Sequence, residues 1–263
     1  MKKDLIRDFF KREIKFEGIE RELKVSIGNK ISSIIGPRRA GKTFYLYFLY
    51  SKLENAMYVN FEDIAFKNLK AEEFFDVIKL FSEMKFKPKI LLLDEIQNLE
   101  DWQTLVRSLQ DRNFRLVITG SSSKLLSKEI ATQLRGRTFS FLLLPFSFRE
   151  FLKAKRIKVD VYLYEEIGFL LKNLREYLEL GGFPEVILKD EKERILKEYA
   201  DEIFYKDFVE RHKIKSFDFG RFLFEFCFQN FSKEISIKNI KKAFNKNISE
   251  KTLYEYVNKL KDT

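Results

Sequence analysis

The sequence predicts an α/β fold in which a parallel sheet is covered by helices on both of its faces. Three observations predict it. Short apolar runs alternate with amphipathic stretches of helical length through the first half of the chain. A glycine-bracketed basic turn follows the first apolar run, and a pair of acids ends the third. Strands that alternate with helices pair in parallel and are buried on both faces, so nearly continuous apolar runs are expected in them.

The apolar runs and the stretches between them define the expected elements in order. Strands are expected at Ile31–Ile35, Met57–Phe61, Lys89–Asp94, Arg115–Thr119 and Thr138–Leu144. Helices of the same region are expected at Asp4–Arg12, Phe44–Leu53, Ala71–Met84, Asp101–Asp111 and Leu125–Leu134. Asp101 is the expected N-cap of its helix, because aspartate is a preferred residue at that position.

The size and composition describe a globular protein. The chain has 263 residues, enough for an α/β domain and a smaller second one, with 45% hydrophobic and 34% charged residues. No apolar run is long enough to span a membrane, and the start MKKDLIRDFF has acids and no small-residue cleavage site, so we expect a cytoplasmic protein. The single cysteine, Cys227, excludes disulfides and cysteine-based metal sites and is expected in a core.

The net charge of +10 favours polyanionic partners, a nucleotide first and nucleic acid second. A lysine-rich surface of the kind found in AT-rich or heat-adapted genomes explains the same number. Net charge alone therefore does not decide between the two.

The stretch ISSIIGPRRAGKT, Ile31–Thr43, fits the phosphate-loop pattern G-x-x-x-x-G-K-[ST]. Glycines let such a loop curl so that consecutive backbone N–H groups surround a triphosphate. Lys42 would reach the β- and γ-phosphates, and the Thr43 hydroxyl would bind Mg²⁺. The alternative is a glycine turn that matches by chance. We expect ATP to be held by the loop and the first helical turn: Gly36, Pro37, Arg38, Arg39, Ala40, Gly41, Lys42, Thr43 and Phe44.

Two adjacent acids, Asp94 and Glu95, follow the run LLL at the carboxyl end of a buried strand. Ligands bind at that end in open α/β sheets, and an acid there is costly to bury unless a cation neutralises it. We therefore assign Asp94 to the Mg²⁺ shell, directly or through water, and Glu95 to polarising the attacking water. The alternative for Asp94 is a helix cap. The second acid favours hydrolysis of ATP over phosphoryl transfer to a metabolite.

The strand Met57–Phe61, inserted between the phosphate loop and Asp94, resembles the additional-strand, catalytic-glutamate branch of P-loop NTPases, which includes the AAA+ proteins. The resemblance implies that a polar residue at the end of the strand beside the acidic strand positions the lytic water. Thr119 is the first candidate and Ser121 the second. A helix N-cap cluster over Ser121–Ser123 is an equal alternative for the serines.

Further segments together resemble the prokaryotic AAA+ ATPases abundant in archaea, of the kind with a C-terminal DUF4143 or nuclease-like region. They lie in order between about residues 20 and 210: GPRRAGKT, NFED, LLLDEIQN, ITGSSS, LRGR before LLPFSFREFL, and GGFPEV. The resemblance implies ATP, Mg²⁺, a helical lid and often a winged-helix segment. The absence of a lid sensor arginine in the sequence argues against an origin-recognition protein.

The resemblance also implies an arginine finger that acts on the nucleotide of a neighbouring subunit in a homo-oligomer. Arg137 is the first candidate and Arg135 the second, both in the run QLRGR before the last strand. The alternative is a surface arginine without a catalytic role.

The chain after Pro145 is expected to be helical and to form a lid and a further segment. We expect an ATPase core over residues 1–145, a lid over 146–214 with a rigid turn at Gly181–Pro184, and a helix-turn-helix or winged-helix-like segment over 215–263. The chain ends where a wing would begin, so we expect a segment that is truncated or naturally short.

The helices of that last segment are expected at Phe219–Phe231, Ser236–Phe244 and Ser249–Leu260. Ser249 with Thr252 predicts an N-cap for a recognition helix whose outward residues include Lys251, Glu255 and Lys259. Residues 236–263 hold seven lysines and three acids, which favours contact with double-stranded DNA. The alternative is a fold used only for packing.

These observations predict a Mg²⁺-dependent AAA+-type ATPase that hydrolyses ATP to ADP and phosphate and couples the cycle to remodelling of DNA or of a protein partner. One alternative is a nucleotide-gated DNA-binding or signalling switch with slow hydrolysis. Another is a protein-binding platform in which ATP has only a structural role.

Overall fold

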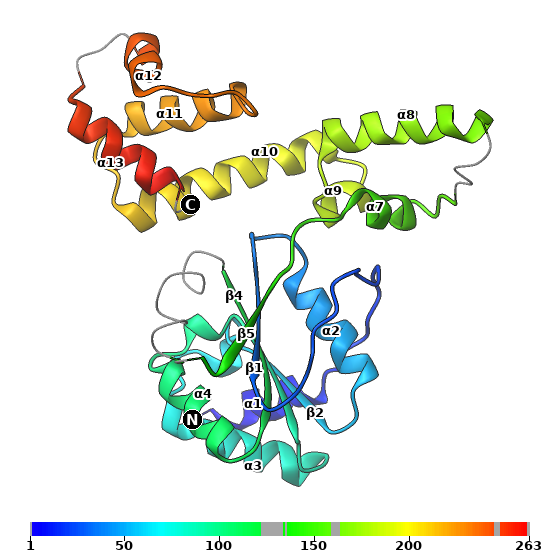
Figure 1. The fold of residues 1–263 in the computed structure, drawn as a ribbon. Coiled ribbons are helices and arrows are strands. Elements are labelled where there is room, and N and C mark those ends of the chain that lie inside the picture. Colours follow the sequence, from blue (N-terminus) through cyan, green and yellow to red (C-terminus); the bar gives the residue numbers. More distant parts are fainter. Residues whose placement is uncertain (1, 122–133, 135, 159–163, 245–247, 262–263) are drawn as a thin grey trace. The chain divides into compact units, whose positions relative to one another are not determined.

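The computed structural model contains two compact units, Met1–Asp190 and Glu191–Thr263 (Figure 1). The residues that the structure describes are 2–121, 134, 136–158, 164–244 and 248–261. The two units do not test the predicted division into a core, a lid and a C-terminal segment at residues 146 and 215, which stays a prediction. The larger part of the predicted helix Leu125–Leu134 and the serines 122 and 123 lie outside the described residues.

A five-stranded sheet forms the centre of the first unit, with the order β2-β3-β4-β1-β5. Every pair is parallel. The strands are β1 (Ile31–Gly36), β2 (Ala56–Asn60), β3 (Ile90–Asp94), β4 (Arg115–Ser121) and β5 (Thr138–Leu142). The predicted α/β class with a parallel sheet is confirmed. Because β4 lies between β1 and β3, the phosphate-loop strand and the acidic strand end on either side of it.

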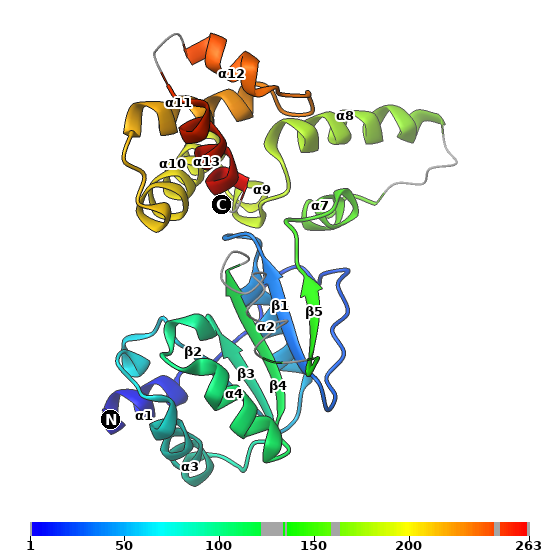
Figure 2. The ribbon, with the colours of Figure 1, turned by 60° about the vertical axis from the view of Figure 1, so that its left-hand side comes forward.

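Helices cover both faces of this sheet (Figure 2), with α2 on one side and α3 and α4 on the other. Their bounds are α1 (Lys3–Lys11), α2 (Lys42–Lys52), α3 (Phe74–Met84) and α4 (Trp102–Asp111). Crossovers between parallel strands are right-handed, so a reversal in strand order is expected to place the next helix on the opposite face. Short 3₁₀ turns lie at Ile64–Phe66, Ala71–Glu73 and Ile96–Asn98.

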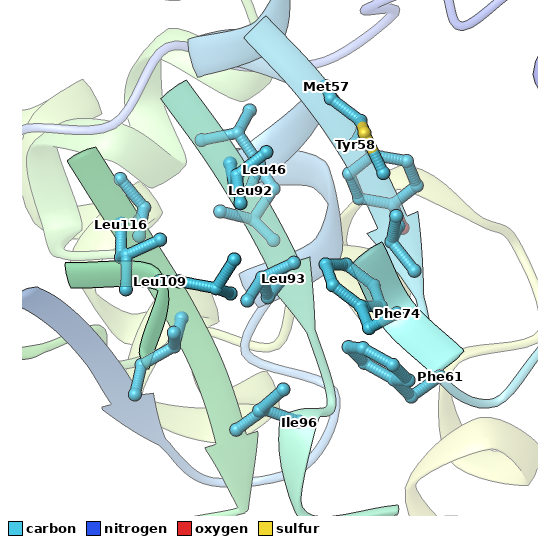
Figure 3. Close-up of a cluster of buried hydrophobic side chains, with 14 of the residues drawn as sticks. Leu46, Met57, Tyr58, Phe61, Phe74, Leu92, Leu93, Ile96, Leu109 and Leu116 are labelled. Carbon is cyan, nitrogen blue, oxygen red and sulfur yellow. The ribbon is translucent and has the colours of Figure 1, made fainter. Parts of the chain in front are cut away.

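The core of the first unit lies between the sheet and its helices (Figure 3). Strand β3 is buried along its whole length because both of its faces are covered. Aromatic rings pack against one another in the same core, with the centroids of Phe61 and Phe74 5.7 Å apart and those of Phe10 and Phe81 5.0 Å apart. Such pairs add to the free energy of burial.

Two local predictions differ from the structure. Asp101 occupies the N-cap position of α4, but its backbone is left-handed, with φ 54°, and its side chain makes no cap hydrogen bond. The predicted strand Thr138–Leu144 ends at Leu142. Leu143 still donates to the Ile35 carbonyl at 2.7 Å, after which the chain turns toward α7.

The first unit continues through α7 (Phe148–Ala154), α8 (Tyr164–Leu180) and α9 (Pro184–Leu188). A capping box starts α7, because Ser147 Oγ accepts from the Glu150 N–H at 3.2 Å and Glu150 accepts from the Ser147 N–H at 2.9 Å. The predicted turn at Gly181–Pro184 also begins a helix, with Pro184 at its first position.

The second unit is helical, with α10 (Lys192–Glu202), a π-helical segment (Ile203–Glu210), α11 (Phe217–Gln229), α12 (Ile237–Phe244) and α13 (Glu250–Lys261). It has its own apolar core, in which Cys227 is partly buried, and burial raises the pKa of that thiol. Ser249 Oγ accepts from the Thr252 N–H at 3.1 Å, as predicted for the start of α13. Across the described part of both units, no helix is long and apolar enough to cross a membrane.

Candidate nucleotide-binding site

A tight loop joins the end of β1 to the start of α2. Gly41 precedes the first helical residue with φ 94°, a conformation that side chains rarely adopt. A Cβ added at Gly36 would lie 2.0 Å from the carbonyl oxygen of Leu143, so only glycine fits there. The N-terminus of an eleven-residue helix, which attracts anions, therefore opens directly onto the loop.

The lysine of the loop, Lys42, is buried, with 5% of its surface exposed. Its Nζ donates to the carbonyl oxygens of Gly36 at 3.0 Å and Pro37 at 3.1 Å. Burial lowers the pKa of Lys42, and the charges of Glu95 and Asp94 oppose that shift. The ammonium thus lies across the loop, where an anion bound by the loop N–H groups would compensate its buried charge.

The aspartate at the end of β3, Asp94, is fully buried and surrounded by hydroxyl groups. The Tyr58 hydroxyl donates to its Oδ2 at 2.9 Å, and the Thr119 hydroxyl donates to its Oδ1. Burial raises the pKa of Asp94, while hydrogen bonds with Thr119 and Tyr58 and the nearby Thr43 side chain oppose the rise. Thr43 and Asp94, the two residues that the sequence predicts as Mg²⁺ ligands, thus lie close to each other.

The neighbouring acid, Glu95, is held at the edge of the sheet in a left-handed conformation, with φ 49°. Its backbone N–H donates to Thr119 Oγ1 at 2.9 Å, and Gln97 Nε2 donates to its carboxylate. Glu62, just after β2, lies close enough to Glu95 and Asp94 to be affected by their charges. Burial raises the pKa of Glu62, and the charges of Glu95 and Asp94 raise it further.

The loop, a buried lysine and a buried aspartate close to Thr43 fit a magnesium-bound nucleotide by their donor chemistry. Residues 28–152 match the family model described as an AAA domain. The chain carries an AAA-type P-loop domain. Residues 171–263 match the model of a domain of unknown function, DUF8612, which differs from the DUF4143 region named above.

Three proteins similar to this chain come from an archaeon and a bacterium. An uncharacterized protein of Methanocaldococcus jannaschii is 42% identical over 98% of this chain and 61% of its own length. One of Haemophilus influenzae is 36% identical over 70% of this chain and 48% of its own length. A second from M. jannaschii is 28% identical over 79% and 50%. The chain thus spans only 48% to 61% of the length of these relatives.

Thr119 contacts both acids of the AAA domain. Its side chain is fully buried, its hydroxyl donates to Asp94, and its oxygen accepts from the Glu95 N–H. Its predicted role in aiding the lytic water remains a proposal, and the contacts favour a role through the two acids. Ser121, the second candidate, ends β4 opposite Gly36 in the register.

Arg137 lies at the amino-terminal ends of the strands, away from the phosphate loop. Its carbonyl accepts from the N–H of Ile31, the first residue of β1, whereas the phosphate loop follows the last residue of that strand. Its guanidinium donates to Asp111 at 2.9 Å in an exposed ion pair. The structure therefore does not bring Arg137 to the site of its own chain, and its predicted action on a neighbouring subunit stays untested. Arg135 lies outside the described residues.

The GGFPE signature lies beside the phosphate loop. Glu185 and Arg39 form an ion pair at 3.8 Å, and Pro184 Cγ is 3.7 Å from the position that a Cβ on Gly41 would take. Gly182 approaches the chain so closely that a Cβ would lie 2.4 Å from the Phe146 carbonyl oxygen. The turn predicted at Gly181–Pro184 and the start of α9 thus lie in contact with the loop. At the loop's far end, Phe44 is 56% exposed.

Sequence reasoning missed three residues of this site: Tyr58, Glu62 and Gln97. Tyr58 could have been found from the strand order, because β2 pairs with β3 and alternate residues of a strand share a face. Glu62 follows the same strand, and its position beside the acidic strand was the available signal. Gln97 sits two residues after Glu95 in LLLDEIQN, but only the left-handed turn at Glu95 brings the two side chains together.

Proposed function

We propose that this protein binds ATP with Mg²⁺ in the cytoplasm and hydrolyses it to ADP and phosphate. One observation carries the proposal: a buried lysine inside a glycine-bounded loop and a fully buried aspartate, with Thr43 close to it, meet at the carboxyl ends of the strands. An uncompensated carboxylate is costly in that position, and a divalent cation offsets the cost.

The chain's own groups have distinct tasks in this proposal. Loop N–H groups and Lys42 would bind phosphate oxygens, and Thr43 and Asp94 would hold the metal. Mg²⁺, when bound, supplies positive charge to the phosphate oxygens and orients them. Glu95 would orient a water molecule and accept its proton. Thr119 would hold the Asp94 carboxylate and the Glu95 backbone in place.

Two substitutions separate binding from hydrolysis. We expect Glu95→Gln to bind ADP with Mg²⁺ as the wild type does and to lower turnover about a hundredfold, because the amide cannot accept the proton of water. We expect Lys42→Ala to lose most of the affinity. Titration calorimetry and phosphate release measure the two quantities. A folded wild-type protein that gives no heat with ADP and Mg²⁺ would contradict the proposal.

A nucleotide-gated switch with slow hydrolysis is the second candidate. The hydrogen bond from Gln97 to the Glu95 carboxylate favours it, because that bond occupies an oxygen that would otherwise face water. A comparison of single-turnover and steady-state rates distinguishes the candidates: a switch retains ADP and turns over slowly in the steady state, whereas a remodelling ATPase cycles repeatedly.

Coupling to double-stranded DNA is the finer part of the proposal. Support comes from the exposed lysines of α12, Lys238, Lys241 and Lys242, and from the capped start of α13, where Lys251 is exposed. Lys241 pairs with Glu250 at 3.9 Å, and Lys259 pairs with Glu255 at 2.6 Å, so acids offset the charge of these two lysines.

Fluorescence anisotropy with a DNA duplex at two salt concentrations tests this coupling. We expect Lys238→Ala with Lys242→Ala to weaken binding and to reduce the slope of log K against log salt by about 0.9 for each phosphate that is no longer neutralised. Lys79→Ala, an exposed lysine on α3 in the first unit, is the matched control. Equal binding by both variants and the wild type would rule out this surface.

A further inference from the structure

Arg21, in the segment before β1, reaches the phosphate loop from outside the predicted motif. Its side chain is only 7% exposed. Its Nη1 donates to the carbonyl oxygen of Ala40 at 2.9 Å, and its Nη2 donates to that of Leu144 at 2.6 Å. The guanidinium also lies over the ring of Phe146, 5.0 Å from the centroid. Arg21 therefore joins the loop to the chain that leaves β5.

Glu150 holds this guanidinium in a fixed orientation. Its two carboxylate oxygens accept from Arg21 Nε at 2.9 Å and Nη2 at 3.0 Å, and its side chain is 5% exposed. The carboxylate also accepts from the Glu22 N–H at 2.6 Å and from the Ser147 N–H. A paired, fully hydrogen-bonded fork of this kind is specific to arginine, because lysine cannot form the two parallel bonds.

The contact with Ala40 acts on the peptide group that precedes α2. In a trans peptide the carbonyl oxygen of Ala40 and the N–H of Gly41 point in opposite directions. A cation bonded to the oxygen polarises the group, which strengthens the N–H as a donor on the other side. The same hydrogen bond also restricts rotation of the backbone at Gly41, where a glycine would otherwise allow many conformations.

We propose that Arg21 is a positioning residue for the nucleotide: it orients and polarises the Ala40–Gly41 peptide from behind, so that the Gly41 N–H faces a bound phosphate. Glu150 fixes Arg21 and links the orientation of the loop to the start of α7. This inference rests on the proposed nucleotide binding and adds a residue that lies fifteen positions before the first glycine of the motif.

Two altered proteins test the proposal in the full chain. Arg21→Lys keeps the charge and removes the fork. The double variant Arg21→Met with Glu150→Met removes both charges, so that no buried charge is left unpaired. The matched control is Lys155→Met, which removes the ion pair between α7 and Glu176 of α8. Circular dichroism and the unfolding temperature verify that each protein is folded.

Calorimetry with ADP and Mg²⁺ is the main measurement. We expect both Arg21 variants to bind about tenfold more weakly than the wild type, because the charge-assisted hydrogen bond that orders the site is removed. The KM for ATP is expected to rise while kcat changes little. Amide hydrogen exchange in the nucleotide-free protein is expected to accelerate over residues 36–43, with no such change in the Lys155 control.

The possible outcomes separate the two levels of inference. Wild-type affinity and wild-type exchange in both folded Arg21 variants would overturn the role of Arg21 and leave nucleotide binding intact. A loss of affinity that the control shares equally would also overturn it, because the effect would then come from α7 alone. No binding by the wild type would remove the proposed function and this inference with it.

Discussion

The buried carboxylate of Asp94 combines a high desolvation cost with hydroxyl donors on several sides. Tyr58 of β2 and Thr119 of β4 donate hydrogen bonds to it, and the Thr43 side chain at the start of α2 lies nearby. Hydroxyl groups stabilise a carboxylate without neutralising it, so the site keeps its affinity for a cation. Tyr58 is the one of these three residues that the sequence pattern does not suggest.

Tyr58→Phe tests this arrangement at a single atom. Loss of the hydroxyl leaves Asp94 Oδ2 with one donor fewer, so we expect unfolding free energy to fall by about 1 to 3 kcal/mol. The Mg²⁺ concentration needed for half-maximal ATP hydrolysis is also expected to change, because Asp94 loses a group that orients it. Denaturant unfolding and a Mg²⁺ titration measure these effects.

Tyr45→Phe is the control for that substitution, since the Tyr45 hydroxyl donates to the Leu23 carbonyl at 2.8 Å rather than to an acid. It is expected to lower stability without changing the Mg²⁺ dependence. An identical Mg²⁺ dependence in Tyr58→Phe and the wild type would contradict the role assigned to Tyr58.

Gln97→Ala tests whether the amide restrains Glu95. Removing a hydrogen bond of ordinary strength frees a carboxylate oxygen for water, and we expect basal hydrolysis to rise about fivefold. Steady-state phosphate release measures it. Gln110→Ala removes a comparable amide bond, from Nε2 to the Asn29 carbonyl, and should leave the rate unchanged. A slower rate in Gln97→Ala would mean that the amide assists Glu95 instead.

At the scale of elements, the start of α7 depends on one ionised side chain. Burial raises the pKa of Glu150, but hydrogen bonds from Arg21 and from the N–H groups of Glu22 and Ser147 outweigh it, so the net pKa is lower than usual. A depressed pKa means that the folded state favours the ionised form. The resulting stability is present above the pKa of the unfolded chain and is lost as the pH falls through the folded value.

Glu150→Gln therefore predicts a pH-dependent difference in stability. The wild type is expected to be more stable than the variant at pH 6 to 7, and the difference should shrink below about pH 4.3, the ordinary value for glutamate. Urea unfolding between pH 3 and 7 provides the measurement. A difference that stays constant over this range would show that ionisation of Glu150 contributes nothing to folding.

Elements that depend on a pattern of neighbouring residues were predictable from the sequence. An apolar run predicted β3, a glycine-rich pattern predicted the loop before α2, and the structure has both. The cap at Asp101 failed because tertiary context imposed a left-handed backbone that the residue type alone does not reveal. Gly182 was predictable as part of a turn, but its close approach to Phe146 was not.

Site contacts between distant segments could not be read from the sequence. Tyr58 and Asp94 are 36 residues apart, and Arg21 and Glu150 are 129 apart. Each contact depends on strand order or on the path of the chain after β5, which local patterns do not encode. Asp94 and Glu95 could be predicted as candidates because burying a carboxylate at the end of an apolar strand is energetically costly.

At the scale of the whole molecule, Arg137 makes assembly a testable requirement. It lies at the edge of the sheet opposite the phosphate loop, so a catalytic role needs a second copy of the chain. We expect light scattering to show a mass increase when ATP and Mg²⁺ are added to Glu95→Gln, which retains nucleotide. Arg137→Ala should lower turnover about a hundredfold while leaving nucleotide affinity unchanged.

Mixing the Arg137→Ala protein with the Lys42→Ala protein supplies the control. The Arg137→Ala protein supplies an intact nucleotide site, and the Lys42→Ala protein supplies the arginine. Partial recovery of activity is therefore expected if the arginine acts between copies. A strict monomer with full activity would exclude that role and leave Arg137 with its exposed ion pair to Asp111.

The contact at Gly36 has a mechanical consequence. The carbonyl oxygen of Leu143 fills the space that a side chain on Gly36 would need. The chain that follows β5 is therefore in direct contact with the start of the phosphate loop. A displacement of the chain after β5 would therefore also displace the first residue of the phosphate loop. In the same way, a shift of the loop at Gly36 would be transmitted to Leu143 and to the chain that follows it.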